Sequence, residues 1–321
     1  MKAIVHESYG DTDVIEFRDV ARPEVGDRDV LVRVRAAGVD RGVWHVLTGR
    51  PYLIRLAGFG VRRPKHPVLG TDVSGVVEAV GGEVTRFRPG DEVMGAGTGA
   101  YAEHTVARED RLVAKPANLS HQQAAAVPVS AVTALQALRD QGRVRPGQRV
   151  LVIGASGGVG TYAVQLGKAL GAEVTGVCST GKVDLVRSLG ADHVIDYTRE
   201  ELGGGPYDLV VDIAGNRPVS LMRRLLTRRG TLVITGGEGG DRWTGGLHRQ
   251  LFALATSAFS RRRMPVFVAR VKDPDLRFLA GLIEAGKVTP AVDRTYSLDQ
   301  APEAIRHLLA GHARGKLVLT V

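Results

Sequence analysis

The chain has 321 residues, a length that favours two domains over one. Hydrophobic residues make up 44% and charged residues 24% of it, which is the composition of a globular protein and excludes a disordered or collagen-like chain. Its 43 lysines and arginines outnumber its 34 acidic residues, but the basic residues are scattered and aromatic residues reach only 5%, which does not favour a nucleic-acid-binding surface.

Cys178 is the single cysteine, and one thiol cannot form an internal disulfide. This cysteine usage predicts a reducing compartment. The first residues lack the apolar stretch of a signal peptide, and the longest uncharged stretches contain proline, glutamine, serine or many glycines. We therefore expect a soluble cytoplasmic protein that has no membrane partner.

Short β-strands are predicted through residues 1–121. Valines alternate with leucine and arginine over 30–34, which is the period of two of a half-buried strand. A β-branched run covers 73–80, and a proline-glycine turn at 89–91 precedes another short strand at 92–94. Short strands separated by glycine and proline predict a small barrel-like β domain.

The pattern changes near residue 120. Residues 122–138 are rich in alanine and favour helix, apart from Pro128. Apolar runs predicted as strands follow, and helical patterns at 159–170 and 185–189 lie between the earlier ones. The predicted strands are 150–153, 174–177, 193–195, 209–211 and 232–234. Alternation of strands and helices predicts an α/β domain with a parallel sheet.

The remaining elements follow the fifth strand of this sheet. Residues 236–246 contain many glycines and predict a loop, and 251–259 predict a helix. We expect a last strand of the sheet at 266–268. The tail after residue 276 predicts two amphipathic helices and a strand at 316–321. Because the α/β domain is complete without the tail, we expect the tail to pack on the first domain.

A glycine-rich turn joins the first strand of the α/β domain to its first helix. It reads Gly154-Ala155-Ser156-Gly157-Gly158-Val159-Gly160. Glycines let the backbone approach a pyrophosphate, and the N-terminus of the helix offers N–H groups and the positive end of a dipole. In its context of strand, turn, helix and second strand, the motif predicts a dinucleotide site. The alternative is a tight turn that binds no ligand.

The end of the second strand predicts which dinucleotide binds. NAD sites usually place an acidic residue there to hold the ribose 2′-hydroxyl, whereas this chain has Gly176-Val177-Cys178-Ser179-Thr180-Gly181-Lys182. Ser179 can donate a hydrogen bond to a 2′-phosphate and Lys182 can supply a positive charge. We therefore predict NADPH over NADH; the alternative is that both are ordinary loop residues.

Several separated segments form a joint pattern with the glycine turn. They are residues 67–77, 87–93, 99–103, 124–128 with 133–134, 189–192 and 311–316. With the order of the domains, this pattern resembles the medium-chain dehydrogenase/reductase superfamily, and within it the zinc-independent quinone oxidoreductase-like branch. The resemblance implies a GroES-like β-barrel catalytic domain over 1–121 and 270–321, and a doubly wound Rossmann domain over 122–269 that binds NADPH.

Zinc ligands of the superfamily are replaced in this chain. Zinc members carry a cysteine where this chain has Asp40, and His-Glu where it has Thr71-Asp72. A four-cysteine structural zinc lobe cannot form with one cysteine, and the remaining histidines and carboxylates match no familiar spacing. We therefore predict that no metal is bound. Without a Lewis acid, acceptors that are already electrophilic are favoured.

The resemblance also implies roles for single residues, with the nicotinamide in a cleft between the domains. Asp40 stands where relatives often carry asparagine near the nicotinamide, and it either accepts from the carboxamide or caps local backbone. His45 or Tyr52 could protonate the product, although solvent or a structural role is equally open. The implied cofactor-binding residues, beyond those at the pyrophosphate, are Thr133, Ser179, Lys182, Tyr197, Gly236, Gly237, His312 and Arg314.

These features predict an NADPH-dependent oxidoreductase that transfers hydride to a quinone or an α,β-unsaturated carbonyl. One alternative is a biosynthetic ketone or enone reductase with a bulky substrate, which the segment 52–65 with Arg55, Arg62 and Arg63 would select. A second is a non-catalytic NADPH-binding sensor or RNA-binding protein. By resemblance we also expect a homodimer, with the strand at 266–268 pairing across a two-fold axis.

Overall fold

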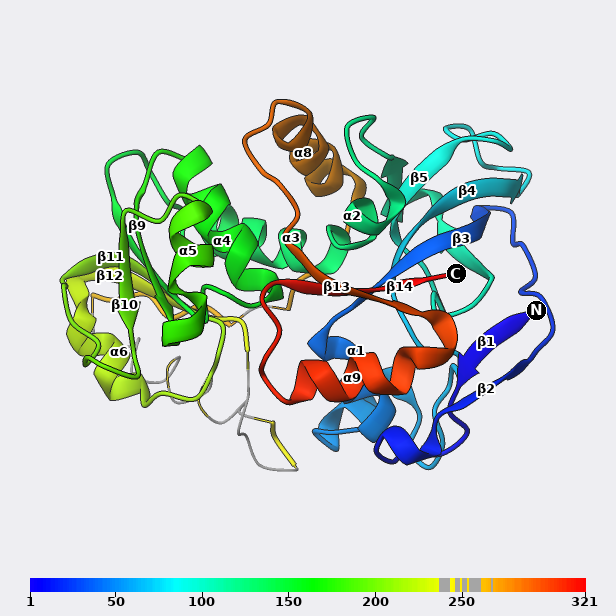
Figure 1. Cartoon of the computed structure of the whole chain (residues 1–321), viewed down its shortest axis with the longest axis horizontal. Helices are drawn as coiled ribbons and strands as arrows, with labels where there is room; N and C mark the ends of the chain where they lie inside the picture. The colour runs from blue at the N-terminus through cyan, green and yellow to red at the C-terminus, as the bar shows by residue number, and fades with distance from the viewer. Residues whose placement is uncertain (237–242, 246–248, 250–252, 254–260, 267) are drawn as a thin grey trace. The chain divides into compact units, whose positions relative to one another are not determined.

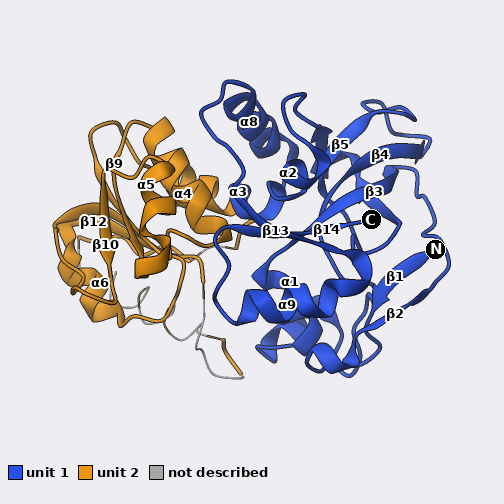
Figure 2. Cartoon of the chain, viewed as in Figure 1, with its two compact units in different colours: residues 1–132, 270–321 blue, residues 133–269 orange. Residues whose placement is uncertain are grey.

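The computed structural model describes the chain except for residues 237–242, 246–248, 250–252, 254–260 and 267. It divides into two compact units (Figure 2). Unit 1 comprises Met1–Val132 and Arg270–Val321, and unit 2 comprises Thr133–Ala269. We predicted the first domain boundary after residue 121, whereas the structure divides the chain after Val132. No helix of the described part is long and apolar enough to cross a membrane.

Unit 1 is built on a seven-stranded sheet in the order β13-β14-β3-β4-β5-β7, with β6 also paired to β3 (Figure 1). Its strands are β3 (Asp29–Val39), β4 (Asp72–Val80), β5 (Glu92–Ala96), β6 (His104–Arg108), β7 (Leu112–Ala114), β13 (Val292–Ser297) and β14 (Lys316–Thr320). A separate two-stranded sheet pairs β1 (Lys2–Val5) with β2 (Glu16–Asp19). The short strands predicted in the first 121 residues are thus present.

The alternation along β3 matches a sheet that has one face on the core and the other in solvent. Val30, Val32 and Val34 are buried in the core of unit 1, whereas Arg33 and Arg35 point to solvent. An antiparallel pair with one face on the core needs this period of two.

Helices cover the sheet of unit 1 at several points. They include α1 (Arg41–Thr48), α2 (His121–Ala125), α8 (Asp273–Glu284) and α9 (Ala301–Leu309). The helix α3 (Pro128–Leu135) crosses the boundary between the units at Val132. Ser120 starts α2 with a complete capping box. The helix predicted over 122–138 is broken at Pro128, which becomes the first residue of α3 because proline has no N–H to donate within a helix. A π-helical segment over 136–141 continues from α3.

Unit 2 contains a parallel sheet in the order β10-β9-β8-β11-β12. The strands are β8 (Arg149–Ile153), β9 (Glu173–Cys178), β10 (His193–Asp196), β11 (Tyr207–Asp212) and β12 (Leu226–Ile234). The helices are α4 (Gly158–Ala169), α5 (Val183–Ser188) and α6 (Val219–Leu225). All five predicted strands and both predicted helical patterns are confirmed, because fully buried parallel strands read as continuous apolar runs.

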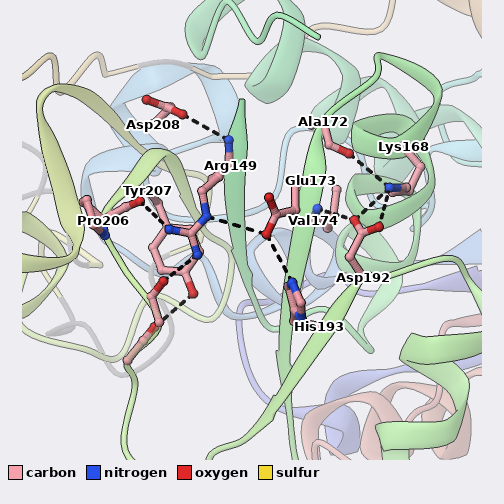
Figure 3. A network of polar contacts seen from close by, with 12 residues as sticks. Arg149, Lys168, Ala172, Glu173, Val174, Asp192, His193, Pro206, Tyr207 and Asp208 are labelled. Carbon is pink, nitrogen blue, oxygen red and sulfur yellow. Dashed lines mark hydrogen bonds and ion pairs between the residues drawn. The ribbon is translucent and has the colours of Figure 1, made fainter. Parts of the chain in front are cut away.

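A polar network ties the amino ends of these strands together (Figure 3). The Arg149 side chain donates to the carbonyls of Gly204 and Pro206 at 2.6 and 3.1 Å and lies beside Glu173. Lys168, from α4, donates to both oxygens of Asp192 at 2.7 Å. Charged residues thus close this edge of the sheet, opposite the edge that carries the glycine turn.

The tail packs on unit 1 as expected. β14 runs antiparallel to β3 and parallel to β13, so the last strand is inside the sheet. The strand predicted at 266–268 is wrong for its two described residues, since Val266 and Val268 form no strand. Instead Arg263 pairs with β12: Leu232 N–H donates to its carbonyl at 2.9 Å. The helix predicted at 251–259 and most of the predicted loop lie outside the described residues.

Candidate functional site

The glycine turn of unit 2 has the geometry that close approach of a ligand requires. Gly154 adopts a φ of +86°, which favours glycine. Gly157 is the N-cap of α4, and being a glycine it has no side chain to accept from the first N–H groups of the helix. A Cβ at Gly157 would meet only the Gly154 carbonyl, at 3.6 Å. The turn therefore leaves a helix N-terminus open to an anion, and the residues fit a pyrophosphate.

Gly160 has a different reason to be glycine. A Cβ there would lie 2.0 Å from the carbonyl oxygen of Gly154 and 2.7 Å from the carbonyl carbon of Ala155. Gly160, the last glycine of the motif, thus lets α4 pack closely on the turn. Ser156 is buried beside it.

The carboxyl end of β9 carries Ser179 and Lys182, as the sequence predicts. Ser179 makes no capping bond with its side chain, and the Lys182 N–H donates to the Ser179 carbonyl at 2.9 Å. Burial and the Asp196 carboxylate raise the pKa of Cys178, which ends the strand, whereas Lys182 and Arg187 act to lower it. One negative and two positive charges therefore lie near this point.

Asp196 is an acidic residue at the carboxyl end of β10, the strand beside β9, and it is the carboxylate that we compare with a ribose-binding one. Its Oδ2 accepts from the Thr180 hydroxyl at 2.6 Å, and its Oδ1 accepts from the N–H and the hydroxyl of Thr198. The two threonine hydroxyls lower the pKa of Asp196. The carboxylate is therefore already engaged by the loops that follow β9 and β10.

Two other predicted cofactor residues of unit 2 follow the carboxyl ends of strands, and in a parallel sheet these ends share one edge. Tyr197 follows β10, is 48% exposed, and has the Arg217 guanidinium 5.8 Å from its ring centre. Gly236 follows β12, where a Cβ would meet the Ile213 carbonyl at 1.9 Å. Thr133 lies on α3, and Gly237 lies outside the described residues.

The predicted residues of unit 1 form two groups. Asp40 is the N-cap of α1, and its Oδ1 accepts from the Gly42 N–H at 2.6 Å. We predicted that this carboxylate either accepts from the nicotinamide carboxamide or caps local backbone, and the structure contains the capping bond. His312 and Arg314 are exposed on the loop between α9 and β14, where the Arg314 N–H donates to Asp293 at 3.0 Å.

His45 and Tyr52 lie on α1 and just after it. The Nδ1 of His45 is 2.7 Å from the Arg50 carbonyl, and since a carbonyl only accepts, Nδ1 carries the proton. Nε2 of the neutral ring is then an acceptor, so His45 can give a proton from Nε2 only as an imidazolium. Tyr52 needs no prior protonation to donate its phenol proton.

Arg55 is held by the protein rather than presented to a substrate. Its guanidinium lies 4.2 Å from the ring centre of Tyr9 and 4.7 Å from that of Tyr52. It also donates to the carbonyls of Gly49 and Thr48 at the end of α1. Arg55 therefore fixes the position of Tyr52 by cation–π contact, while Arg62 and Arg63 remain exposed.

Sequence reasoning missed two buried carboxylates. Asp72 is fully buried; its Oδ2 accepts from Lys316 Nζ at 2.9 Å and its Oδ1 from the Val129 N–H at 2.8 Å. Asp212 is equally buried at the end of β11, where it pairs with Arg249 at 3.0 Å. The partners are far apart in the sequence, so no local pattern could reveal either pair.

A Ser-His-Glu chain in unit 1 has the spacing of a hydrolase triad but not its function. Ser74 Oγ is 2.9 Å from His121 Nδ1, and His121 Nε2 is 3.2 Å from Glu92. The Ser74 hydroxyl is fully buried and also donates to the Val93 carbonyl at 3.0 Å. A nucleophile must reach its substrate, so this chain is structural.

No group of three or more His, Cys, Asp or Glu side chains that could hold a metal occurs within the part of the chain that the structure describes. Thr71 and Asp72 stand at the positions where zinc members of the superfamily carry ligands. The Asp72 carboxylate is paired with a lysine ammonium, which leaves it poorly suited to a metal cation.

Comparison with known proteins identifies the family. The family described as "Alcohol dehydrogenase GroES-like domain" matches residues 26–117, and the one described as "Zinc-binding dehydrogenase" matches 189–319. The chain is 33% identical over 338 residues to the chloroplastic quinone-oxidoreductase homolog of Spinacia oleracea, covering 99% of this chain and 98% of that protein. It is 33% identical to the mitochondrial NAD(P)H oxidoreductase RTN4IP1 of Homo sapiens, covering 100% of this chain and 89% of that one.

Solved structures agree with this assignment. The quinone oxidoreductase of Coxiella burnetii has a TM-score of 0.87 at 28% identity, and covers 100% of this chain and 99% of its own. The Escherichia coli quinone oxidoreductase complexed with NADPH has a TM-score of 0.83 at 25% identity and covers both chains completely.

A GroES-like domain and a Rossmann domain with a dinucleotide-type turn define a medium-chain dehydrogenase/reductase, which confirms the predicted fold class. The chain belongs to the quinone oxidoreductase-like family of these oxidoreductases.

Proposed function

We propose that this protein is an NADPH-dependent, zinc-free oxidoreductase that reduces a quinone or an α,β-unsaturated carbonyl compound. The observation that carries the proposal is the open turn at Gly157, where the N-terminus of α4 can receive a pyrophosphate. The relatives named as quinone oxidoreductases, one of them complexed with NADPH, support the same reaction class.

Cofactor choice is proposed from the end of β9. Ser179 and Lys182 would hold the 2′-phosphate, and Asp196 does not compete for a 2′-hydroxyl because Thr180 and Thr198 already occupy its oxygens. Lys182→Gln should weaken NADPH binding about ten-fold, the loss of one charged hydrogen bond, and leave NADH binding unchanged. Equal effects on both Kd values would overturn the NADPH preference.

NADPH, when bound, supplies the hydride. The chain's own residues bind and orient it: Ser156, Gly157, Gly158 and Val159 at the pyrophosphate, and Tyr197, Thr133, Gly236, Gly237, His312 and Arg314 at other groups. Tyr52, positioned by Arg55, is the residue that we assign to donate a proton to the developing oxygen anion. Asp40 then has no proton-transfer step of its own, since it caps α1.

The first experiment measures NADPH oxidation with an ortho-quinone and with a small enone, in buffer that contains a chelator. Turnover that the chelator does not reduce is the expected result, and the preferred acceptor separates quinone from enone chemistry. Turnover lost with the chelator and restored by zinc would contradict the zinc-free proposal. Tight NADPH binding without turnover would favour a bulky pathway substrate or a sensor instead.

The oligomeric state and the cellular compartment of the protein are also proposed here. We propose a homodimer formed through the segment around Val268, whose side chain is 83% exposed. The single buried thiol supports a reducing compartment such as the cytoplasm.

A further inference from the structure

A cationic pocket lies in unit 2, away from the glycine turn. It has a volume of about 310 Å³ and is lined by Ser220, Arg223, Arg224 and Arg262. The first three lie on α6 at spacings of three and four residues, so they share one face of the helix. Arg262 joins them from the segment that follows, where it is anchored beside the amino end of β12.

The described lining residues carry positive charge only. Arginine is always protonated, so these residues hold three positive charges, and no carboxylate is among them. Among the described residues, neither Arg223 nor Arg224 takes part in an ion pair, although both occur in a chain with many exposed carboxylates. The guanidinium groups of Arg223 and Arg224, with that of Arg262 beside them, therefore form an electrostatic site for an anion.

Two of the arginines have geometry that points to a ligand. Arg262 Nε donates to the Thr227 carbonyl at 3.1 Å and one of its NH2 groups donates to the Leu226 carbonyl at 3.2 Å, so this guanidinium is held in place before any ligand arrives. The Arg223 Nε is buried and has no hydrogen-bond partner among the described residues. A buried donor without a partner is costly, which makes Arg223 a candidate to bind an incoming oxygen.

The position of the pocket separates it from the cofactor site. Leu226 and Thr227 begin β12, whereas the glycine turn and Ser179 follow the carboxyl ends of their strands. A nine-residue strand spans roughly 25–30 Å, so the two edges of the sheet are far apart. None of the described lining residues is aromatic, so they offer no ring on which a base of single-stranded nucleic acid could stack.

We propose that this pocket is a binding site for the phosphate group of a small anionic ligand, distinct from the dinucleotide site. Guanidinium groups bind phosphate oxygens through paired N–H donors, and the Ser220 hydroxyl adds a further donor. A terminal phosphate carries more than one negative charge at neutral pH and three acceptor oxygens, which match three arginines better than a single carboxylate does.

Inorganic phosphate is the probe, titrated calorimetrically into protein saturated with NADPH at constant ionic strength. NADPH keeps phosphate out of the dinucleotide site, and a parallel titration without NADPH shows whether that site takes up phosphate as well. One saturable site per chain is expected in the NADPH-saturated protein. Arg223→Gln and Arg224→Gln should each weaken phosphate binding about ten-fold or more.

Arg228→Gln is the matched control, since it removes the same charge from an exposed position on β12 outside the lining. The proposal predicts that this variant binds phosphate as the wild type does, and that all three variants retain the wild-type Tm and Kd for NADPH. Absence of saturable binding, or equal losses in Arg224→Gln and Arg228→Gln, would overturn it. So would a single-stranded oligonucleotide that binds much more tightly than phosphate and depends on the same two arginines, because the ligand would then be nucleic acid.

Discussion

At the scale of single residues, Asp72 and Lys316 form a buried ion pair in unit 1, and burying the two charges costs free energy. Both side chains are almost fully removed from water, and the ammonium and carboxylate lie 2.9 Å apart. Taking two charges out of water costs several kcal/mol each, and their attraction offsets this cost only while both are present. The pair joins the first residue of β4 to the first residue of β14, so it helps to hold the tail on unit 1.

Breaking this pair from one side should destabilise the protein strongly. We expect Lys316→Met to lower the free energy of unfolding by about 3–5 kcal/mol, because the Asp72 carboxylate is left buried without its partner. The double variant Asp72→Asn with Lys316→Met should recover much of this loss. Urea unfolding of the wild type, both single variants and the double variant measures the coupling. Additive losses would contradict a coupled pair.

The same carboxyl group predicts a pH dependence. Burial raises the pKa of Asp72, Lys316 opposes this rise and the negative charge of Asp40 adds to it, and the result is a shift from 3.8 to about 6. The folded protein therefore binds this proton more tightly than the unfolded chain does. Its contribution to stability is then fully present below about pH 4 and decreases as pH rises towards about 6. Urea unfolding across this range should show the wild type losing stability relative to the double variant; parallel curves would contradict the assignment.

At the scale of elements, the turn before α4 uses glycine for two separate purposes. Gly157 adopts extended backbone that any residue can adopt, and a Cβ there meets nothing closer than ordinary contact. Gly160 has no such room, since its Cβ would meet the backbone of the turn. One glycine thus leaves space for a ligand and the other allows the helix to pack.

This difference can be tested with two alanine variants. Gly157→Ala should keep the wild-type Tm but weaken NADPH binding about ten-fold or more, because the new methyl group occupies the approach to the N–H groups. Gly160→Ala should lower the Tm by several degrees, because the helix must move away from the turn. Thermal unfolding and NADPH titration of both proteins provide the comparison. Unchanged NADPH binding in Gly157→Ala would argue against this turn as the pyrophosphate site.

At the scale of the whole molecule, chemical labelling of Cys178 can measure the unfolding of unit 2, because this thiol is buried in the folded unit. The thiol is buried at the end of β9, and burial raises its pKa to about 11. Thiolate is therefore scarce at neutral pH, and the group is shielded as well. We expect iodoacetamide to leave the native protein unmodified and to label one thiol per chain in urea, measured by mass spectrometry.

Saturating NADPH should slow this labelling further in mild denaturant, since a ligand that binds only the folded unit opposes its opening. Rapid labelling of the native protein would contradict the burial of Cys178.

The proposed homodimer is also tested at this scale. Light scattering at micromolar concentration should give twice the mass of the chain, and Val268→Glu should shift the protein towards monomer by placing charge in an apolar contact. Arg228→Glu, a charge change on β12, is the control and should leave the mass unchanged. A monomeric wild type would contradict the proposal.

Much of the fold could be predicted because its signals are local. The apolar runs of β8, β9 and β11 and the glycine turn are contiguous in the sequence, and their order alone indicates a parallel sheet. The strand predicted at 266–268 failed because short apolar runs do not reveal their partners; Arg263, a charged residue, pairs with β12 instead.

Less of the candidate site than of the fold could be predicted from the sequence. Ser179 and Lys182 follow a strand and could be located by counting along the chain. The contacts of Arg55 with Tyr9 and Tyr52, and of Asp72 with Lys316, join residues that are distant in sequence, and they depend on how the chain folds back. The role of Tyr52 therefore stays a prediction that kinetics must test.

The placement of β14 between β13 and β3 has a consequence for the synthesis of this protein on the ribosome. Unit 2 is one continuous stretch and has all of its strands once residue 269 has left the exit tunnel. Unit 1 must wait, because β14, the strand that fills its sheet, comes after the whole of unit 2 in the chain. Nascent chains therefore carry an incomplete sheet with open edges until β14 has been translated. A stop codon between unit 2 and β14 would leave a folded unit 2 attached to a unit 1 that chaperones and proteases recognise as unfinished.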